Sequence, residues 1–222
     1  QGSALPTPSA ATATQESPRG NPRADRRSYY AYSRSVWAEI QGDLDAAMMW
    51  GQEALRFDPG SRLLRQHLAS VLLKKGDFRG AIREGEEILA ASPDDVRAHL
   101  LLAAAYQGLR NVRQAEKHYR EIIRLDPKRP EAYLFLGNLY AETRNYPEAI
   151  AAFEELARVN PKSHLAHYSL GRIYVESKEY EKARAAFQTA IEKNPDCDPA
   201  WVGLAGSLEL QGRYEEAVDV YR

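Results

Sequence analysis

The residues with the greatest potential for chemistry are five histidines and one cysteine. His164 and His167 stand three residues apart, whereas His67, His99 and His118 are scattered along the chain. A catalytic metal needs about three protein ligands in a fixed geometry, and no Asp or Glu stands at the spacing of a zinc protease motif. The histidines therefore do not predict a metal site. His99 and His167 are expected to take part in packing instead.

The remaining motifs give no better catalytic candidate. Cys197 lies between Asp196 and Asp198, whose negative charges oppose formation of a thiolate. The sequence has no glycine-rich loop that would cradle a phosphate and no serine on a nucleophile elbow. A single cysteine also excludes an internal disulfide. We therefore expect a protein that is not an enzyme and that holds no cofactor or metal.

The composition is that of an ordinary folded protein with no sign of nucleic-acid binding. Hydrophobic residues make up 44% and charged residues 27% of the 222 residues. The 30 basic and 31 acidic residues nearly cancel, so the basic excess that nucleic-acid-binding proteins show is missing. No apolar run approaches the roughly 18 residues needed to cross a bilayer. We expect no nucleic-acid partner and no membrane span.

The first 27 residues differ from the rest of the chain. The stretch QGSALPTPSAATATQESPRGNPRADRR is rich in small residues and proline and has a single leucine, so burial of apolar surface cannot offset its ordering entropy. We predict a disordered leader over residues 1–27. A small-residue leader that starts at Gln1 fits export after removal of a signal peptide, which favours an exported or periplasmic location. The cytoplasm is the alternative, because QGS could equally remain from a cleaved tag.

Prolines at a regular interval show how the rest of the chain is organised. Five of them are separated by one constant interval, at Pro59, Pro93, Pro127, Pro161 and Pro195. Twelve residues before each proline stands an alanine, and one more continues the series: Ala47, Ala81, Ala115, Ala149, Ala183 and Ala217. We call these six residues the alanine column. A fixed period of this length is typical of stacked repeats, so we predict an array.

Each unit is expected to contain two helices. The segment PEAYLFLGNLYAET places apolar or small residues three and four apart, which is the spacing of one helix face. A short break such as GD or RN follows, and then a second helix that must end before the repeated proline, because proline lacks an N–H and restricts the preceding residue. The alanine column predicts where two helices approach closely.

The repeat resembles that of the tetratricopeptide repeat family, including its bacterial members. The family's motif is met by Tyr133, Leu136, Gly137, Tyr140, Ala149, Phe153 and Pro161. The resemblance implies an all-α fold, a right-handed superhelical solenoid of stacked antiparallel helix pairs. Its repeats would be 28–61, 62–95, 96–129, 130–163 and 164–197, followed by a partial repeat at 198–222.

The two terminal units depart from the motif. Arg34 stands where the family has leucine and Gly51 where it has an aromatic residue, which is typical of a unit with one side facing water. In the partial sixth unit, we expect Leu208, Val218 and Tyr221 to be poorly covered. Either more chain follows Arg222, which we favour, or another molecule covers this end, so self-association through the open C-terminal repeat is a second expectation.

The resemblance also implies a concave groove, lined by the first helix of each unit, that holds a peptide or a partner helix. The groove residues it implies are Gln66, His67, Ser70, Arg97, Leu100, Leu101, Ala104, Leu134, Phe135, Asn138, Tyr168, Ser169 and Arg172. Some family members clamp a C-terminal carboxylate with lysine, asparagine and arginine. The matching positions here lack the cations in either register, so a clamp of that kind is not expected.

The middle of this groove is expected to be apolar. Its centre would be Leu100, Leu101, Leu134, Phe135 and Tyr168. Such a strip suits an extended apolar peptide or an amphipathic helix, and Asn138 could hold a peptide backbone because its amide both donates and accepts. The alternative is that some of these residues, Leu101 and Leu134 above all, pack against neighbouring helices.

Together these features predict a non-catalytic scaffold or adaptor. It would bind a protein partner in the concave groove, and assembly of a cell-envelope or secretion complex is the setting that the leader favours. Two alternatives stay open. One is a self-assembling repeat protein, and the other is a regulatory arm of a larger enzyme.

Overall fold

The computed structural model describes residues 22–222, with side chains from Arg26 onward. Within this range it contains twelve α-helices and no strand. In chain order they are α1 (Pro22–Ile40), α2 (Leu44–Phe57), α3 (Arg62–Lys75), α4 (Phe78–Ala91), α5 (Val96–Gly108), α6 (Val112–Leu125), α7 (Pro130–Glu142), α8 (Tyr146–Val159), α9 (His164–Glu176), α10 (Tyr180–Lys193), α11 (Asp198–Glu209) and α12 (Tyr214–Val220). Each helix packs against the next one in the chain. The predicted all-α array of stacked helix pairs is confirmed.

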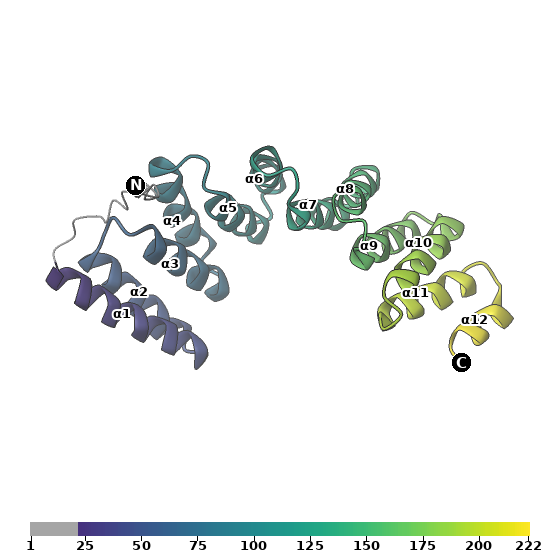
Figure 1. Cartoon of the computed structure of the whole chain (residues 1–222), viewed down its shortest axis with the longest axis horizontal. Helices are drawn as coiled ribbons and strands as arrows, with labels where there is room; N and C mark the ends of the chain where they lie inside the picture. The colour runs from purple at the N-terminus through teal and green to yellow at the C-terminus, as the bar shows by residue number, and fades with distance from the viewer. Residues whose placement is uncertain (1–21) are drawn as a thin grey trace, which may run out of the picture.

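The helix pairs form an open arch (Figure 1). Helices α1 and α2 lie at one foot of the arch and α11 and α12 at the other. In the middle, α5, α7 and α9 lie on the inner side, whereas α6, α8 and α10 lie on the outer side. Among the first helices, α3 contacts α5 and α9 contacts α11, whereas α7 is more widely spaced from α5 and α9.

Each second helix ends two residues before a repeated proline, as predicted. Helices α2, α4, α6, α8 and α10 end at Phe57, Ala91, Leu125, Val159 and Lys193. The same turn follows each of them. The N–H two residues after the proline donates to the carbonyl of the residue before it, with distances of 2.9 to 3.2 Å. The chain therefore reverses direction in the same way after every unit.

A side chain six residues after the proline donates to the proline carbonyl in four of these five turns. The donors are Arg65 Nη2 to Pro59 at 3.1 Å, His99 Nε2 to Pro93 at 3.0 Å, Tyr133 Oη to Pro127 at 3.0 Å and Trp201 Nε1 to Pro195 at 2.9 Å. At Pro161 the donor is Lys193 Nζ, at 2.6 Å. These bonds tie the turn to the helices beside it, because each satisfies a carbonyl that the turn leaves free.

The alanine column lies where the two helices of a pair meet, as predicted. Five of its members are 0% exposed and Ala217 is 1% exposed. Glycines on the first helices pack as tightly: a Cβ on Gly137 would lie 2.5 Å from the Phe153 ring, and one on Gly171 would lie 2.6 Å from the Phe187 ring. The core around both rings is close-packed, so neither ring can shift to make space. Only small residues therefore fit at these positions.

Helix α1 begins earlier than the predicted end of the leader. It starts at Pro22, whereas the leader was expected to extend to residue 27. Proline is favoured in the first turn of a helix, where its missing N–H has no partner to lose. The part of the leader before residue 22 lies outside the described residues.

The predicted exposure of the sixth unit is partly wrong. Leu208 is only 3% exposed, because it packs with Ala205 of its own helix and Ala217 of α12. Val218 and Tyr221 are 49% and 57% exposed, as expected. One turn of α12 is thus enough to cover Leu208, while the outward side of α12 is left open.

We predict that Ala149→Leu lowers the free energy of unfolding by about 1–3 kcal/mol, since the added atoms have no space between the helices. Chemical denaturation followed by circular dichroism measures the change. Ala151→Leu is the matched control, because Ala151 lies on the same helix but is exposed. Equal stability of the two variants would contradict the packing described here.

Candidate functional site

A cavity of about 700 Å³ lies on the inner side of the arch, between α5, α6, α7 and α9. Figure 1 shows α5, α7 and α9 around this part of the inner side. Its lining residues are Ala104, Gln107, Tyr119, Phe135, Asn138, Ala141, Glu142, Arg144, Arg172 and Glu176. The cavity exists because the inner helices are widely spaced around α7. It is the best candidate for a binding site among the described residues.

The cavity brings together four of the thirteen groove residues expected from the sequence. These are Ala104, Phe135, Asn138 and Arg172. They come from three successive first helices, at positions that face the inside of the arch. The expected groove is therefore represented by its central part, and the remaining nine residues lie elsewhere.

Three more expected residues line a separate depression of about 660 Å³ between α3, α5 and the turn before α7. They are Gln66, Arg97 and Leu100. Gln66 is only 7% exposed, and its amide donates to the Asp95 carboxylate at 3.3 and 3.4 Å. Gln66 therefore has a partner within the protein and joins α3 to the start of α5.

His67 links α1 to α3. The Ser35 hydroxyl donates to the Ala47 carbonyl at 2.6 Å, so it must accept the hydrogen bond from His67 Nε2 at 2.7 Å. Burial lowers the pKa of His67, which a neighbouring Glu39 carboxylate only partly offsets. The ring of Tyr32 packs edge-on against His67, with 5.0 Å between ring centres. This histidine is a neutral structural link between two inner helices.

The expected apolar strip is not an exposed surface. Leu100, Leu134 and Phe135 are half-buried and pack against the core around α6, α7 and α8. Tyr168 packs against a second core that contains Phe187, with 6.0 Å between their ring centres. Leu101 and Ser70 are also half-buried, and Ser169 is 7% exposed. The apolar side chains serve mainly to hold the inner helices, and the cavity lining is more polar than expected.

One wall of the cavity is a hydrogen-bonded network that joins α5, α6 and α7. The Tyr119 hydroxyl donates to Gln107 Oε1 at 3.0 Å, and Gln107 Nε2 donates to both carboxylate oxygens of Glu142 at 2.9 and 3.0 Å. The Phe135 ring stacks on Tyr119, with 5.9 Å between centres. Burial and the charge of Glu142 raise the pKa of Tyr119 to about 12, so its hydroxyl remains a donor at neutral pH.

The opposite rim carries polar side chains with no hydrogen bond or ion pair to any other residue that the structure describes. They are Asn138, Arg144, Arg172 and Glu176. These side chains can form hydrogen bonds with a ligand, whereas Gln107 and Glu142 are already hydrogen-bonded to each other. An aromatic wall beside unpaired amide, guanidinium and carboxylate groups can accept an apolar side chain and several polar groups at once.

A pair of histidines forms a contact that sequence reasoning missed. His99 Nδ1 lies 2.9 Å from His118 Nδ1. Because His99 Nε2 donates to the Pro93 carbonyl, its Nδ1 must accept, and His118 Nδ1 donates. Tyr106 stacks on His118 at 5.6 Å. The two histidines lie on different helices and 19 residues apart in the sequence, so no sequence motif predicts their contact.

The surroundings of His118 oppose its protonation. Burial lowers its pKa to about 4, and the nearby His99 and Lys117 act in the same direction, against a smaller effect of Glu121. The neutral ring suits its place between Tyr106 and His99. The pair belongs to the contact between α5 and α6, and it holds the region from which Gln107 and Tyr119 reach the cavity.

No cluster of three or more histidine, cysteine, aspartate or glutamate side chains is arranged to hold a metal ion in residues 22–222. In the same range no helix is both long and apolar enough to span a membrane.

Comparisons with known proteins place the sequence among repeat proteins. One family model described as a tetratricopeptide repeat matches residues 100–164, 136–196 and 168–222, and a second with the same description matches 39–105 and 72–124. A search of curated protein sequences finds no match.

Solved structures of the same architecture span most of the chain. A tetratricopeptide repeat protein from the bacterium Parabacteroides merdae is 21% identical over 88% of this chain and 77% of that chain, with a TM-score of 0.72. MamA is 28% identical over 72% of this chain and 87% of that chain, with a TM-score of 0.63. YrrB, described as having an unusual peptide-binding site, is 20% identical over 77% of this chain and 88% of that chain, with a TM-score of 0.59.

We predict that the protein loses stability as the pH falls from about 6.5 towards 4. In that range His118 stays neutral in the folded state but takes up a proton in the unfolded state. Protonation therefore lowers the free energy of unfolding. Because His118 is only half-buried, its contribution is on the order of 1 kcal/mol after allowance for solvent screening. The lowered pKa values of His67 and His167 act with the same sign.

Urea unfolding of the wild type and of His118→Phe at pH 7 and pH 5 measures this effect. The variant should lose less stability between the two pH values than the wild type does. His164→Phe is the control, since His164 lies at the start of α9, away from this pair. Parallel pH profiles of wild type and His118→Phe would refute the assignment.

Proposed function

Because the chain belongs to the tetratricopeptide repeat family, whose matched segments together cover residues 39–222, we propose that it is a scaffold that binds a partner polypeptide in the cavity between α5, α6, α7 and α9. Protein–protein interaction is the general role of this fold. The observation that supports this particular site is the set of unpaired polar side chains facing an aromatic wall inside the arch.

The cavity suits a segment that combines apolar and polar groups. An apolar side chain of the partner packs against Phe135, and burying one such side chain contributes about 1.5–3 kcal/mol. Asn138 both donates and accepts, so it can bind a peptide group of the partner backbone at about 0.5–1.5 kcal/mol per hydrogen bond. An extended segment or one face of a helix presents both kinds of group.

The charges at the rim select among partners more than they add affinity. Arg144 and Arg172 favour acidic side chains near one end of the segment, while Glu176 favours a basic neighbour. Charged groups at the edge of an interface mainly change association rates and exclude wrong partners. The bound segment is therefore one with an apolar residue flanked by charges.

Two groups of the cavity wall, Tyr119 and Glu142, are not available for acid–base catalysis, which fits a role in binding. Tyr119 is held protonated, and the Glu142 carboxylate is bound by the Gln107 amide. A general base must be free to take a proton from a substrate, and neither group is. The setting that we propose remains the assembly of a cell-envelope or secretion complex. It rests on the composition of the leader, and fractionation of cells that produce the full-length protein tests it.

Self-assembly is the second candidate, and one observation favours it. Helix α12 exposes Tyr214 and Val218, and Tyr221 directly after it is also exposed, each at least 49% accessible. A second copy of the chain could cover this apolar surface. Molecular mass measured by light scattering over a range of concentrations separates this candidate from a monomeric scaffold.

Photo-crosslinking from position 138 in native extract tests the proposed site. A crosslinking amino acid at this position lines the cavity and breaks no hydrogen bond within the described protein. The same amino acid at position 151, on the exposed side of α8, is the control. Capture of one foreign polypeptide from 138 and not from 151 is the expected result. Capture of the protein itself favours self-assembly, and equal capture from both positions refutes the cavity.

We predict that Arg172→Glu weakens binding of the captured segment at least about tenfold, which corresponds to about 1.4 kcal/mol. The change places a negative charge opposite the acidic side chain expected in the segment, so it adds repulsion, and it removes no contact within the described protein. Lys162→Glu, the same change in the exposed turn before α9, should alter affinity less than about twofold. Isothermal calorimetry measures both. Unchanged affinity of Arg172→Glu would place the binding surface elsewhere.

A further inference from the structure

The charges of the chain are unevenly distributed, although they nearly cancel overall. Residues 96–129, which contain α5 and α6, carry eight basic and three acidic side chains. The preceding unit, 62–95, carries six of each, and the following unit, 130–163, carries three basic and five acidic side chains. The positive charge of the protein is thus concentrated in the middle of the arch.

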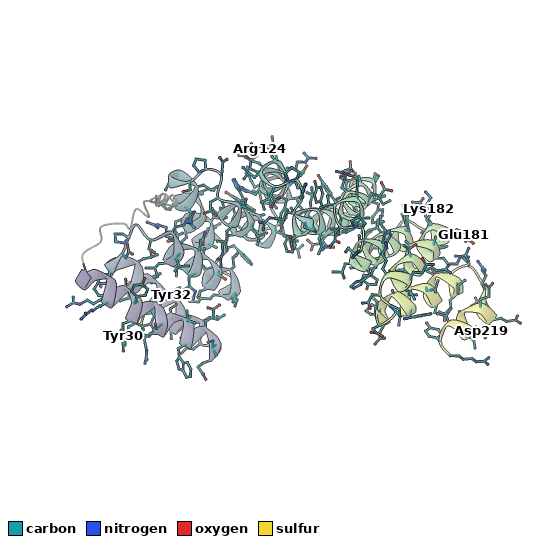
Figure 2. The ribbon with its side chains drawn as sticks, viewed as in Figure 1. Tyr30, Tyr32, Arg124, Glu181, Lys182 and Asp219 are labelled. Carbon is teal, nitrogen blue, oxygen red and sulfur yellow. The ribbon has the colours of Figure 1, made fainter. Side chains whose placement is uncertain are left out.

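Half of these eight basic side chains lie in one stripe along α6. Its members are Arg113, Lys117, Arg120 and Arg124, at the spacing i, i+4, i+7 and i+11 that places side chains on one face of a helix. All four are exposed. They border a surface depression of about 910 Å³ along α6. Figure 2 shows Arg124 on the outer crest of the arch, on the side opposite the cavity. We call these four residues the basic stripe.

The acidic residues of α6 do not neutralise the stripe from outside. Glu116 binds Arg120 at 2.8 Å and Glu121 binds Arg124 at 2.7 Å, but the side chains of both acids are half-buried while the arginines are 64% and 60% exposed. Arg113 and Lys117 make no ion pair with any residue that the structure describes. Arg124 also pairs with Asp94, from the turn between α4 and α5, at 3.2 Å, and the Asp94 side chain is 75% exposed. The positive charge available to a partner is therefore carried mainly by Arg113, Lys117 and the exposed Arg120, and the first two are unpaired.

We infer that the basic stripe is a second interaction surface, which binds an acidic helical segment of a partner protein. The four basic groups, from residue 113 to residue 124, span about 16 Å of helix. A partner helix with carboxylates at the same spacing would place each of them opposite a cation of the stripe. Attraction of this kind raises the association rate and weakens as salt is added.

Other anionic partners fit the stripe less well. A membrane surface would be expected to bind a face that also carries apolar anchors, and no large hydrophobic residue of α6 is exposed. Single-stranded nucleic acid is usually held by basic groups interleaved with accessible aromatic rings. The aromatic residue of α6, Tyr119, is 2% exposed and faces the cavity. A protein helix with regularly spaced carboxylates matches both the charge and the spacing.

Fluorescence anisotropy with a labelled alanine-rich helical peptide tests this inference on the full chain. The peptide carries four glutamates at the spacing i, i+4, i+7 and i+11. A second peptide of the same composition, with the glutamates distributed around the helix, tests whether the spacing matters. We predict that the wild type binds the first peptide at least about fivefold more tightly than the second at low salt, and that added salt weakens this binding.

Charge reversal with a matched control completes the test. The double variant R113E/K117E should weaken binding of the first peptide at least about tenfold, and R113Q/K117Q should have an intermediate effect. The control is R79E/R83E on α4, which makes the same change at the same spacing on exposed residues without an ion pair to any described residue. Its affinity should change less than about twofold. Circular dichroism confirms that all variants remain folded.

Three results would overturn the inference. Equal loss in R79E/R83E and R113E/K117E would mean that the peptide responds to overall charge and not to the stripe. Equal affinity for the two peptides would mean that spacing is not recognised. Failure of the wild type to bind either peptide, together with binding to vesicles that contain phosphatidylserine or to a single-stranded oligonucleotide, would assign the stripe to a membrane or a nucleic acid.

Discussion

The architecture depends on the close contact between the two helices of each pair. At the alanine column the side chains are 0–1% exposed, and a Cβ on Gly137 would lie 2.5 Å from the Phe153 ring. Backbones can approach this closely only where side chains are very small, and the aromatic ring beside them fills the rest of the gap. The contact recurs once in every unit, so it gives every pair a similar shape. The arch is the result of stacking similar pairs.

The turns between units carry the second constraint. Each proline ends a helix, and the donor six residues later binds the proline carbonyl in four of the five turns. The donor group differs, being a guanidinium, an imidazole, a hydroxyl or an indole, but the acceptor and the spacing stay the same. Where His167 stands in this position, Lys193 from the next helix supplies the bond instead. The turn geometry thus requires a hydrogen-bond donor, but several residue types can supply it.

Periodicity made the fold predictable, because the same residue types at the same spacing must pack in the same way. The resemblance to the tetratricopeptide repeat family implied Ala104, Phe135, Asn138 and Arg172 as groove residues, and these four line the cavity. Register does not say how far apart neighbouring inner helices lie. The distance between neighbouring inner helices decides whether Leu100 and Leu134 are buried or exposed. This distance depends on how each whole unit packs against the next one. Contacts between different helices, such as Tyr119 with Gln107 and His99 with His118, were missed for the same reason.

The two proposed surfaces lie on opposite sides of one rigid element, so their partners would not compete. Tyr119 of α6 faces the cavity, while the neighbouring Arg120 belongs to the basic stripe. On the outer side, the Tyr140 hydroxyl of α7 donates to Glu116 and accepts from Arg120, both at 3.0 Å. On the inner side, Tyr119 is bound through Gln107 to Glu142 of α7. Helix α6 is therefore fixed to α7 from both sides before any partner arrives. Binding at one surface therefore does not require a change in the structure of the other. A scaffold that holds two proteins at once requires this independence.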